Sequence, residues 1–275
     1  MSRNILSVYV LRLSDYAMNP QLLSYNFGLD VLAFSTTRSG GYSIGNYAEF
    51  NINRYCGDSL DAINQNNIAL CAELGIVPDC LLMPHQVHLD KTVTVDTAFM
   101  QLSASDRLQA LDGYDAIMTN LPGVCVGVST ADCIPILLYD AEHGAVCAVH
   151  AGWRGTVARI VRKAIVQMQQ IYNSRPEQLV AQIGPGIHVE SFEVGDEVYQ
   201  AFYDAGFQMS VISRMERKWH IDLPLCNRMQ LEASGVPSGS ITVSPICTYQ
   251  QSDRFFSARR LGINSGRIFT GIMLR

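Results

Sequence analysis

A tight hairpin between two apolar segments constrains the fold of this chain more than any other feature. Residues 135–140 (PILLYD) and 145–150 (AVCAVH) are short apolar runs typical of buried strands, and the loop Ala-Glu-His-Gly joins them. A connection this short favours an antiparallel pair. The pairing that closes the loop places His150 opposite Pro135, so we expect His150 at the open end of the hairpin.

Cys133 is a second residue that the hairpin brings near His150 in our interpretation. It lies two residues before Pro135, and side chains alternate along a strand, so the thiol and the imidazole share a face. Such diagonal neighbours lie about 7 to 8 Å apart between backbones, a span that one metal ion can bridge. Both residue types are good zinc ligands. Two alternatives stay open: a thiol nucleophile activated by the histidine, or two ordinary buried residues.

A third ligand is available in the segment PHQVHLDKTV, residues 84–93, which contains His85 and His88. The two histidines are three residues apart, so in an extended segment their side chains point to opposite faces. We therefore expect only one of them to bind the metal directly.

The remaining pattern predicts an α+β fold, with a mixed sheet covered by helices and no clean domain boundary. Besides the hairpin, strands are predicted at 31–37, 91–96, 114–119, 123–129 and 179–184. Helices are predicted at 59–74, 153–172, 194–205 and 222–234. In the second of these, one apolar stripe contains Val157, Ile160, Val161, Ala164, Ile165, Met168 and Ile171.

Composition excludes several classes of function. The 275 residues are 48% hydrophobic and carry a net charge of −5, without a block of like charges, so a nucleic-acid surface is not expected. The eight cysteines lack paired spacing, and we find neither a signal peptide nor an apolar run of about 18 residues. We expect a reduced, cytoplasmic protein whose partners are small ligands rather than nucleic acid or a membrane.

Six ordered motifs carry a resemblance to a known family. The chain resembles the YfiH family, once labelled multicopper polyphenol oxidase or laccase-domain protein, and the match runs from about residue 34 to the C-terminus. We therefore expect one catalytic domain over residues 1–275. The motifs are FSTTRSGGYSIGNYAEFN (34–51), QVH (86–88), STADC-x-P (129–135), HAGWRGT (150–156), IGPGI with FEVG downstream (183–195), and CTY with RFFSARR (247–260).

The resemblance implies a layered α/β/β/α sandwich with mixed sheets, similar to the catalytic domain of cytotoxic necrotizing factor. It also implies a zinc ion held by His88, Cys133 and His150. The implied activities are phosphorolysis of purine nucleosides (inosine, adenosine and methylthioadenosine) and deamination of adenosine. Two positions depart from the family pattern: Ser191 replaces a common cysteine and Leu89 a common glycine. Neither departure removes an implied ligand.

The two implied reactions need different parts. Zinc with an open coordination position activates water for attack on C6 of adenosine. Phosphorolysis needs a phosphate site and stabilisation of an oxocarbenium-like ribosyl group, by analogy with glycoside cleavage. Arg38, in the glycine-rich TTRSGG loop, and Arg154, near the start of the 153–172 helix, are candidate anion contacts, although surface arginines are often only solvated.

Four further residues are candidates for lesser roles. Asp132 either orients a ligand or moves a proton beside Cys133, or it caps a turn. Asn51 either contacts substrate or forms an Asx-turn, and His85 is expected near the site as a substrate contact rather than a ligand. Gly152 is expected to permit the turn from strand to helix.

Alternative functions remain at the level of sequence. A metal-free hydrolase or amidase would use Cys133 as nucleophile and His150 as base. A copper-dependent phenol oxidase fits less well, since the chain lacks repeated His-x-His pairs, and copper would then be an adventitious substitute at the same soft site. A peptidoglycan-maturation factor and a homo-oligomer are further hypotheses.

Overall fold

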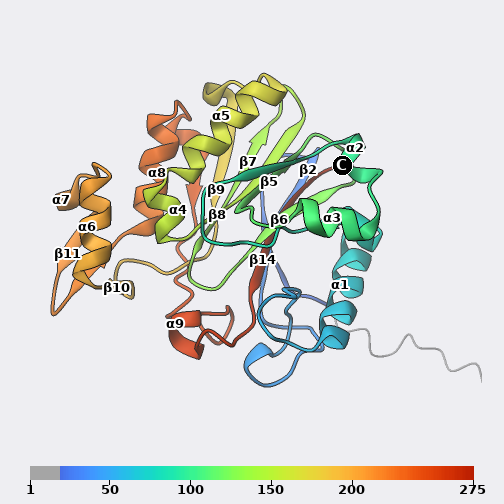
Figure 1. Cartoon of the computed structure of the whole chain (residues 1–275), viewed down its shortest axis with the longest axis horizontal. Coiled ribbons are helices and arrows are strands. Elements are labelled where there is room, and N and C mark those ends of the chain that lie inside the picture. The colour runs from blue at the N-terminus through green and yellow to red at the C-terminus, as the bar shows by residue number, and fades with distance from the viewer. Residues whose placement is uncertain (1–18) are drawn as a thin grey trace, which may run out of the picture.

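Two β-sheets packed face to face form the centre of the computed structural model, which describes residues 19–275 (Figure 1). The first sheet contains, in spatial order, β1 (Leu22–Tyr25), β2 (Val31–Thr36), β14 (Ile268–Leu274), β6 (Cys125–Thr130) and β3 (Leu81–Leu82). The second contains β13 (Ile241–Val243), β9 (Leu179–Ile183), β7 (Ile134–Asp140), β8 (Ala145–Ala151), β5 (Ala116–Thr119) and β4 (Thr92–Val95). Each sheet mixes parallel and antiparallel pairs.

Helices cover the outer faces of the sheets (Figure 1). The six-stranded sheet packs against α4 (Trp153–Val157), α5 (Ile160–Tyr172) and α8 (Leu223–Ala233), and the five-stranded sheet against α1 (Leu60–Leu74). Between the sheets lies an apolar layer that includes Val126 and Ile272 from one sheet and Leu137 and Ala148 from the other. The predicted α/β/β/α layering is therefore confirmed, while the likeness to the toxin domain stays a prediction.

The hairpin that opened the sequence argument has the expected register. Asp140 pairs with Ala145 and Pro135 with His150. The other five predicted strands are also present, with bounds that shift by one or two residues at their ends.

The predicted helix at 153–172 is wrong in one respect, because it is two helices. Arg159 adopts a left-handed backbone conformation, with φ +63° and ψ +39°, and this separates α4 from α5. Within α5 the buried stripe runs on from Met168 to Tyr172, four residues later, so Tyr172 is buried and Ile171 is 46% exposed.

The other predicted helices are confirmed as α1, α6 (Asp196–Asp204) and α8. A small third sheet, β10 (Glu193–Val194), β12 (Trp219–Ile221) and β11 (Ser213–Met215), packs with α6 and α7 (Met209–Ile212) to one side. The short helices α2 (Thr97–Met100), α3 (Ala104–Ala110) and α9 (Ala258–Leu261) complete the α-helices of the described residues. Within residues 19–275, none of the helices has the length and apolar character needed to cross a membrane.

Candidate metal centre

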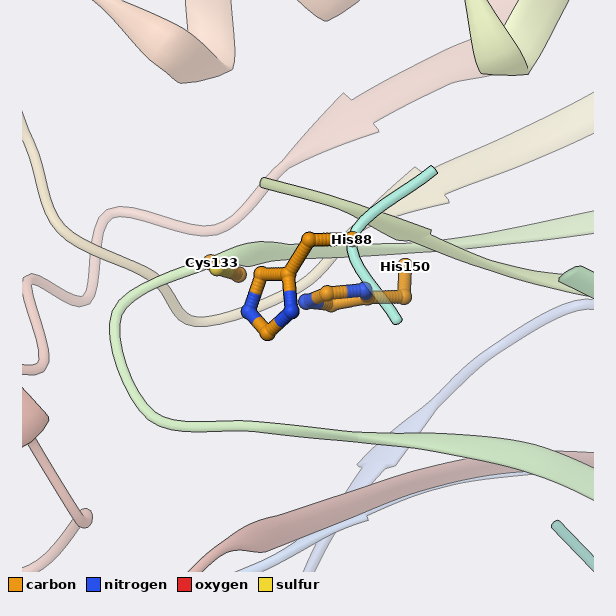
Figure 2. Close-up of side chains that lie close together, drawn as sticks. All are labelled: His88, Cys133 and His150. Carbon is orange, nitrogen blue, oxygen red and sulfur yellow. The ribbon is translucent and has the colours of Figure 1, made fainter. Parts of the chain in front are cut away.

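Three side chains from separate stretches of chain converge at the open end of the hairpin formed by the central strands β7 and β8. His88 lies in the loop between β3 and β4, Cys133 directly precedes β7, and His150 lies in β8. Their donor atoms are all within 4.8 Å of one another, and the two imidazole rings stand edge to face with centroids 4.8 Å apart (Figure 2). The cluster contains the residues predicted as metal ligands.

The alternation of β8 explains where the cluster lies. Cys147 and Val149 point toward the helical layer, whereas Val146 and Ala148 point into the layer between the two sheets. His150 continues this second face, since side chains two and four residues apart share a side of the strand. The cluster therefore lies where the core between the sheets ends, with His150 buried and His88 exposed.

Asp115 holds His150 from the neighbouring strand, and the sequence analysis missed it. The register that pairs Ala116 with Val149 places Asp115 opposite His150, and the backbone N–H of His150 donates to the Asp115 carbonyl at 2.7 Å. Asp115 Oδ1 and His150 Nδ1 are also 2.7 Å apart, with both side chains buried. The carboxylate thus fixes the ring so that Nε2 is left for a metal, as carboxylate partners of metal-ligating histidines do.

The same carboxylate also shapes the loop that carries His88. The backbone N–H groups of His88 and Leu89 donate to Asp115 at 2.9 and 2.7 Å, and that of Val87 at 3.3 Å. His88 has φ +62°, a conformation uncommon for residues other than glycine. Three N–H groups converging on one buried charge stabilise this turn, so Asp115 positions two of the three candidate ligands.

Gln86 ties this loop to the five-stranded sheet. Its side chain donates to the Ser129 carbonyl and accepts from the Ser129 N–H, both at 2.8 Å, as a neighbouring strand would. Gln86 and His88 are the first and last residues of the QVH motif. Gln86 fixes the backbone, and His88 supplies a candidate ligand. Sequence spacing alone does not reveal this division of roles.

The pKa values of Cys133, His150 and Asp115 depend on the contacts that these groups make with one another. Burial raises the pKa of Cys133, but the charge of His150 and hydrogen bonds with His150 and His88 outweigh burial and lower that pKa to about 6. Burial lowers the pKa of His150, while Cys133 and Asp115 together raise it to about 9. Burial likewise raises the pKa of Asp115, and its bonds with His150 bring it below the ordinary carboxyl value. Cys133 is therefore a thiolate at neutral pH.

The donor set fits one metal ion. At tetrahedral angles, two zinc bonds of about 2.0 to 2.3 Å hold their donor atoms about 3.3 to 3.8 Å apart, and the donor atoms here all lie within 4.8 Å of one another. They would need to approach one another by about 1 to 1.5 Å at most to share one ion. A thiolate and two imidazoles suit a borderline-soft ion, and three protein ligands leave a fourth position for another molecule. His88, Cys133 and His150 are the residues that would hold the ion.

Gly152 is required for space rather than for its torsion angles, which corrects the expectation from sequence. Its φ of −69° and ψ of 175° are accessible to any residue. A Cβ atom at this position would lie 2.9 Å from the Cys133 Sγ and 3.4 Å from the His88 ring. A side chain at residue 152 would therefore push directly into the cluster.

Asp132 does not orient a ligand; its role is the turn-fixing alternative. Its φ of +92° directs the carboxylate away from the cluster, where Oδ1 accepts from the Thr248 hydroxyl at 2.7 Å and Oδ2 from the Arg259 N–H at 2.6 Å. The bonds fasten the Cys133 loop to the start of α9. The predicted catalytic role of Asp132 is therefore replaced by a structural one.

Asn51 is also structural, and its predicted contact with substrate is wrong. The residue is fully buried, and its amide donates to Asp58 at 2.8 Å while its oxygen accepts from the Asn53 and Arg267 N–H groups, each at 3.1 Å. The bond to Asn53 is the Asx-turn that the sequence left open. No face of Asn51 is left for a ligand.

The glycines beside Arg38 serve packing rather than an anion. Added Cβ atoms on Gly40 and Gly41 would lie 1.9 Å from the Asn19 carbonyl oxygen and 2.3 Å from the Glu49 carbonyl oxygen, so the protein itself fills the space beside them. The Gly40 N–H donates to the Glu49 carboxylate at 2.9 Å. Arg38 itself is half-buried over the Phe256 ring and donates to the carbonyls of Ala48 and Ser252.

The other two predicted substrate contacts lie at accessible positions. Arg154 is exposed, with its guanidinium 4.2 Å from the centroid of the Trp153 ring. His85 is 38% exposed, pairs with Asp112 through Nδ1 at 2.6 Å and stacks on Tyr55. It is outside the donor cluster, in agreement with the prediction that only one histidine of this segment joins it.

These features define a layered α+β protein with a histidine–cysteine–histidine centre at the edge of its core. The chain belongs to the family described as multi-copper polyphenol oxidoreductase laccase, whose model matches residues 32–275. The resemblance to the YfiH family is thereby confirmed.

Named relatives and solved structures agree with this assignment. The chain is 49% identical over 244 residues to a purine nucleoside phosphorylase of Bacteroides thetaiotaomicron, covering 88% of this chain and 90% of that protein. It is 43% identical over 245 residues to adenosine deaminase RL5 from an unknown prokaryotic organism, covering 88% and 93%. The crystal structure of the hypothetical protein YfiH from Bacillus licheniformis superimposes with a TM-score of 0.86 at 27% identity, covering 93% and 97%.

Proposed function

We propose that this chain is a zinc-dependent purine nucleoside phosphorylase for inosine, adenosine and methylthioadenosine that also deaminates adenosine. The observation that carries the proposal is the cluster of His88, Cys133 and His150, in which one carboxylate positions both histidines. The names of two relatives that match most of this chain, a phosphorylase and a deaminase, support both reactions.

The protein's own groups prepare the site for these reactions. Cys133 is already ionised at neutral pH, so it can bind a metal without releasing a proton. Asp115 holds His150 with Nε2 facing that thiolate. Gly152 leaves the space that the two ligand side chains occupy. A zinc ion held there supplies Lewis acidity for polarising a substrate group.

Phosphate is the second substrate in this proposal, and Arg38 is the residue we propose to contact it. Only part of its guanidinium is engaged by backbone carbonyls, so one edge is left for a charge-assisted bond worth about 1.5 to 3 kcal/mol. We expect Arg38→Ala to lower phosphorolysis by roughly tenfold to a hundredfold and to spare deamination, which uses no phosphate. Steady-state rates of both reactions test this, and equal losses would assign Arg38 to folding or nucleoside binding.

The decisive experiment for the function is a product analysis. The purified protein is incubated with adenosine, inosine and methylthioadenosine, each with and without phosphate, and products are separated by chromatography. Release of free base only with phosphate indicates phosphorolysis, whereas conversion of adenosine to inosine indicates deamination. Absence of both reactions in zinc-loaded protein would contradict the proposal.

A second candidate follows from the ionised Cys133–His150 pair. A thiolate beside an imidazolium is also the arrangement of a cysteine nucleophile, so a metal-free hydrolase or amidase is the alternative function. The family description names copper, and we propose that copper binds the same three residues only as an adventitious substitute. Metal analysis of protein purified without added metal distinguishes these cases, since a hydrolase of this kind is active without bound metal.

A further inference from the structure

A second histidine–aspartate pair lies outside the metal cluster. His85 Nδ1 and Asp112 Oδ1 are 2.6 Å apart, and their side chains are 38% and 65% exposed. Their backbones are also joined, because the His85 N–H donates to the Leu111 carbonyl at 2.9 Å and the Gly113 N–H to the His85 carbonyl at 3.0 Å. The position of this imidazole is therefore fixed by main chain as well as side chain.

The ring is held on one edge and one face. Asp112 takes Nδ1, and the Tyr55 ring stacks on the imidazole with centroids 4.0 Å apart and planes 25° from parallel. Among the described residues, Nε2 has no hydrogen-bond partner. The pair thus presents one oriented nitrogen to an incoming molecule, which is the arrangement required for general acid–base catalysis.

His85 is within reach of a substrate at the metal centre. It lies three positions before His88 in the chain, so their Cα atoms are at most about 11 Å apart. The two residues are therefore separated by no more than about the long dimension of a purine nucleoside. A nucleoside whose ribose lies at the cluster can therefore place its base against His85.

We propose that His85 is a catalytic residue that donates a proton to the leaving purine, and that Asp112 is its positioning residue. The inference rests on the phosphorolysis proposed above. As the C1′–N9 bond breaks, its electron pair stays on the purine, and a phosphate oxygen forms the new bond to C1′. The His85 Nε2–H gives its proton to N7 of the base. The proton that hydrogen phosphate loses on forming the ester then restores the imidazolium through water.

The carboxylate of Asp112 has a defined part in this step. By accepting the Nδ1–H it keeps Nε2 as the nitrogen that faces the base. Tyr55 restricts rotation of the ring by stacking. Deamination at C6 leaves the C1′–N9 bond intact and has no need of this proton.

The test compares inosine with 7-methylinosine, whose base already carries a substituent on N7 and leaves without a proton there. We expect His85→Ala to lower kcat for inosine phosphorolysis about a hundredfold and to leave 7-methylinosine nearly unaffected. Asp112→Asn should lower kcat for inosine by less, with the same split between substrates. Zinc content, measured on the same preparations, should equal that of the wild type.

His143→Ala is the matched control. His143 also pairs with an aspartate, Asp140, at 2.9 Å, but it lies in the turn at the opposite end of the β7–β8 hairpin from His150. We expect no change in rate for either substrate. Equal losses of His85→Ala on both substrates, or loss of zinc equal to that of His88→Ala, would overturn the inference alone. A wild-type protein that releases no base from inosine with phosphate would overturn the proposed function as well.

Discussion

The two histidine–aspartate pairs beside the active centre have nearly the same geometry and very different surroundings. His150 and Asp115 are 2.7 Å apart, with side chains 3% and 0% exposed. His85 and Asp112 are 2.6 Å apart, with side chains 38% and 65% exposed. Asp112 and Asp115 lie three positions apart in one short stretch of chain. His85 and His88 lie three positions apart in another.

The difference lies in how many groups share each carboxylate. Asp115 accepts hydrogen bonds from the imidazole of His150 and from the N–H groups of Val87, His88 and Leu89. A buried charge is stable only with such compensation, and removing its partners leaves groups unsatisfied. The Asp112 side chain bonds to one imidazole, and water reaches the rest of it.

The comparison shows that burial changes what the same pair of side chains can do. A buried pair can hold neighbouring groups in place, whereas an exposed pair can exchange a proton with a bound molecule. In the buried pair both oxygens of the Asp115 carboxylate have fixed partners, so the orientation of His150 and the path of the His88 loop are set before a metal arrives. In the exposed pair one ring nitrogen stays available to substrate. Metal binding should therefore depend on the buried pair and proton transfer on the exposed one.

The largest expected difference between the two pairs is in the amount of zinc that variants of each pair retain. We predict about one zinc per chain in the wild type and none in the Cys133→Ala, His150→Ala double variant, because two of three donor atoms are gone. His85→Ala should retain its zinc. Elemental analysis after dialysis checks both variants, and full zinc retention in the double variant would place the metal elsewhere.

The next largest effect concerns the ionisation of Cys133 in metal-free protein. The pKa of this thiol is lowered to about 6 chiefly by His150, against burial, which raises it. In His150→Gln the opposing charge is lost, so the pKa should rise toward or above the ordinary thiol value near 9. The thiolate fraction at pH 7 would then fall roughly tenfold to a hundredfold.

Rates of alkylation measured from pH 5 to pH 10 check this prediction. The rate should reach half its maximum near pH 6 in the wild type, and only at clearly higher pH in His150→Gln. His85→Gln is the matched control from the exposed pair and should leave the profile in place. An unchanged profile in His150→Gln would show that the low pKa has another source.

The approach of Cys133 to His150 could be predicted from the sequence because it depends on local rules. The short loop at 141–144 sets the register of β7 and β8, and that register brings Cys133 and His150 together. This relation needs only strand alternation and a tight turn. The choice of His88 over His85 came instead from the QVH motif, because His88 lies in a turn with φ +62° rather than in an extended segment.

Positions set by distant pairing could not be predicted in the same way. Asp115 lies opposite His150 only because β5 pairs with β8, and no short turn links these strands. Strand β14 was missed for the same reason, since its partners β2 and β6 lie far away in the sequence and Gly271 interrupts its apolar run. An aspartate at the start of the apolar segment 114–119 was the available signal for the missed positioning residue.

Residues adjacent in sequence to a ligand were the least reliable candidates. Asp132 precedes Cys133, yet its positive φ turns the carboxylate toward Thr248 and Arg259. Asn51 lies in a motif of the family but is enclosed by its own loop. Backbone torsion and burial, which decide both cases, are not visible in residue type or spacing.

The smallest expected effect comes from replacing one carboxylate oxygen by an amide nitrogen in the aspartate of each pair. Asp115→Asn keeps the size of the side chain but removes the charge and one of the two acceptors that His88, Leu89 and His150 share. We expect zinc affinity to fall about tenfold, the lower end of the range for partners of metal ligands. Asp112→Asn should leave zinc affinity within about twofold, because the Asp112 carboxylate bonds only to a histidine outside the donor cluster. Competition against a chelator with known zinc affinity, together with circular dichroism to verify folding, measures both variants. Equal losses of affinity in the two variants would mean that burial does not separate the roles of the pairs.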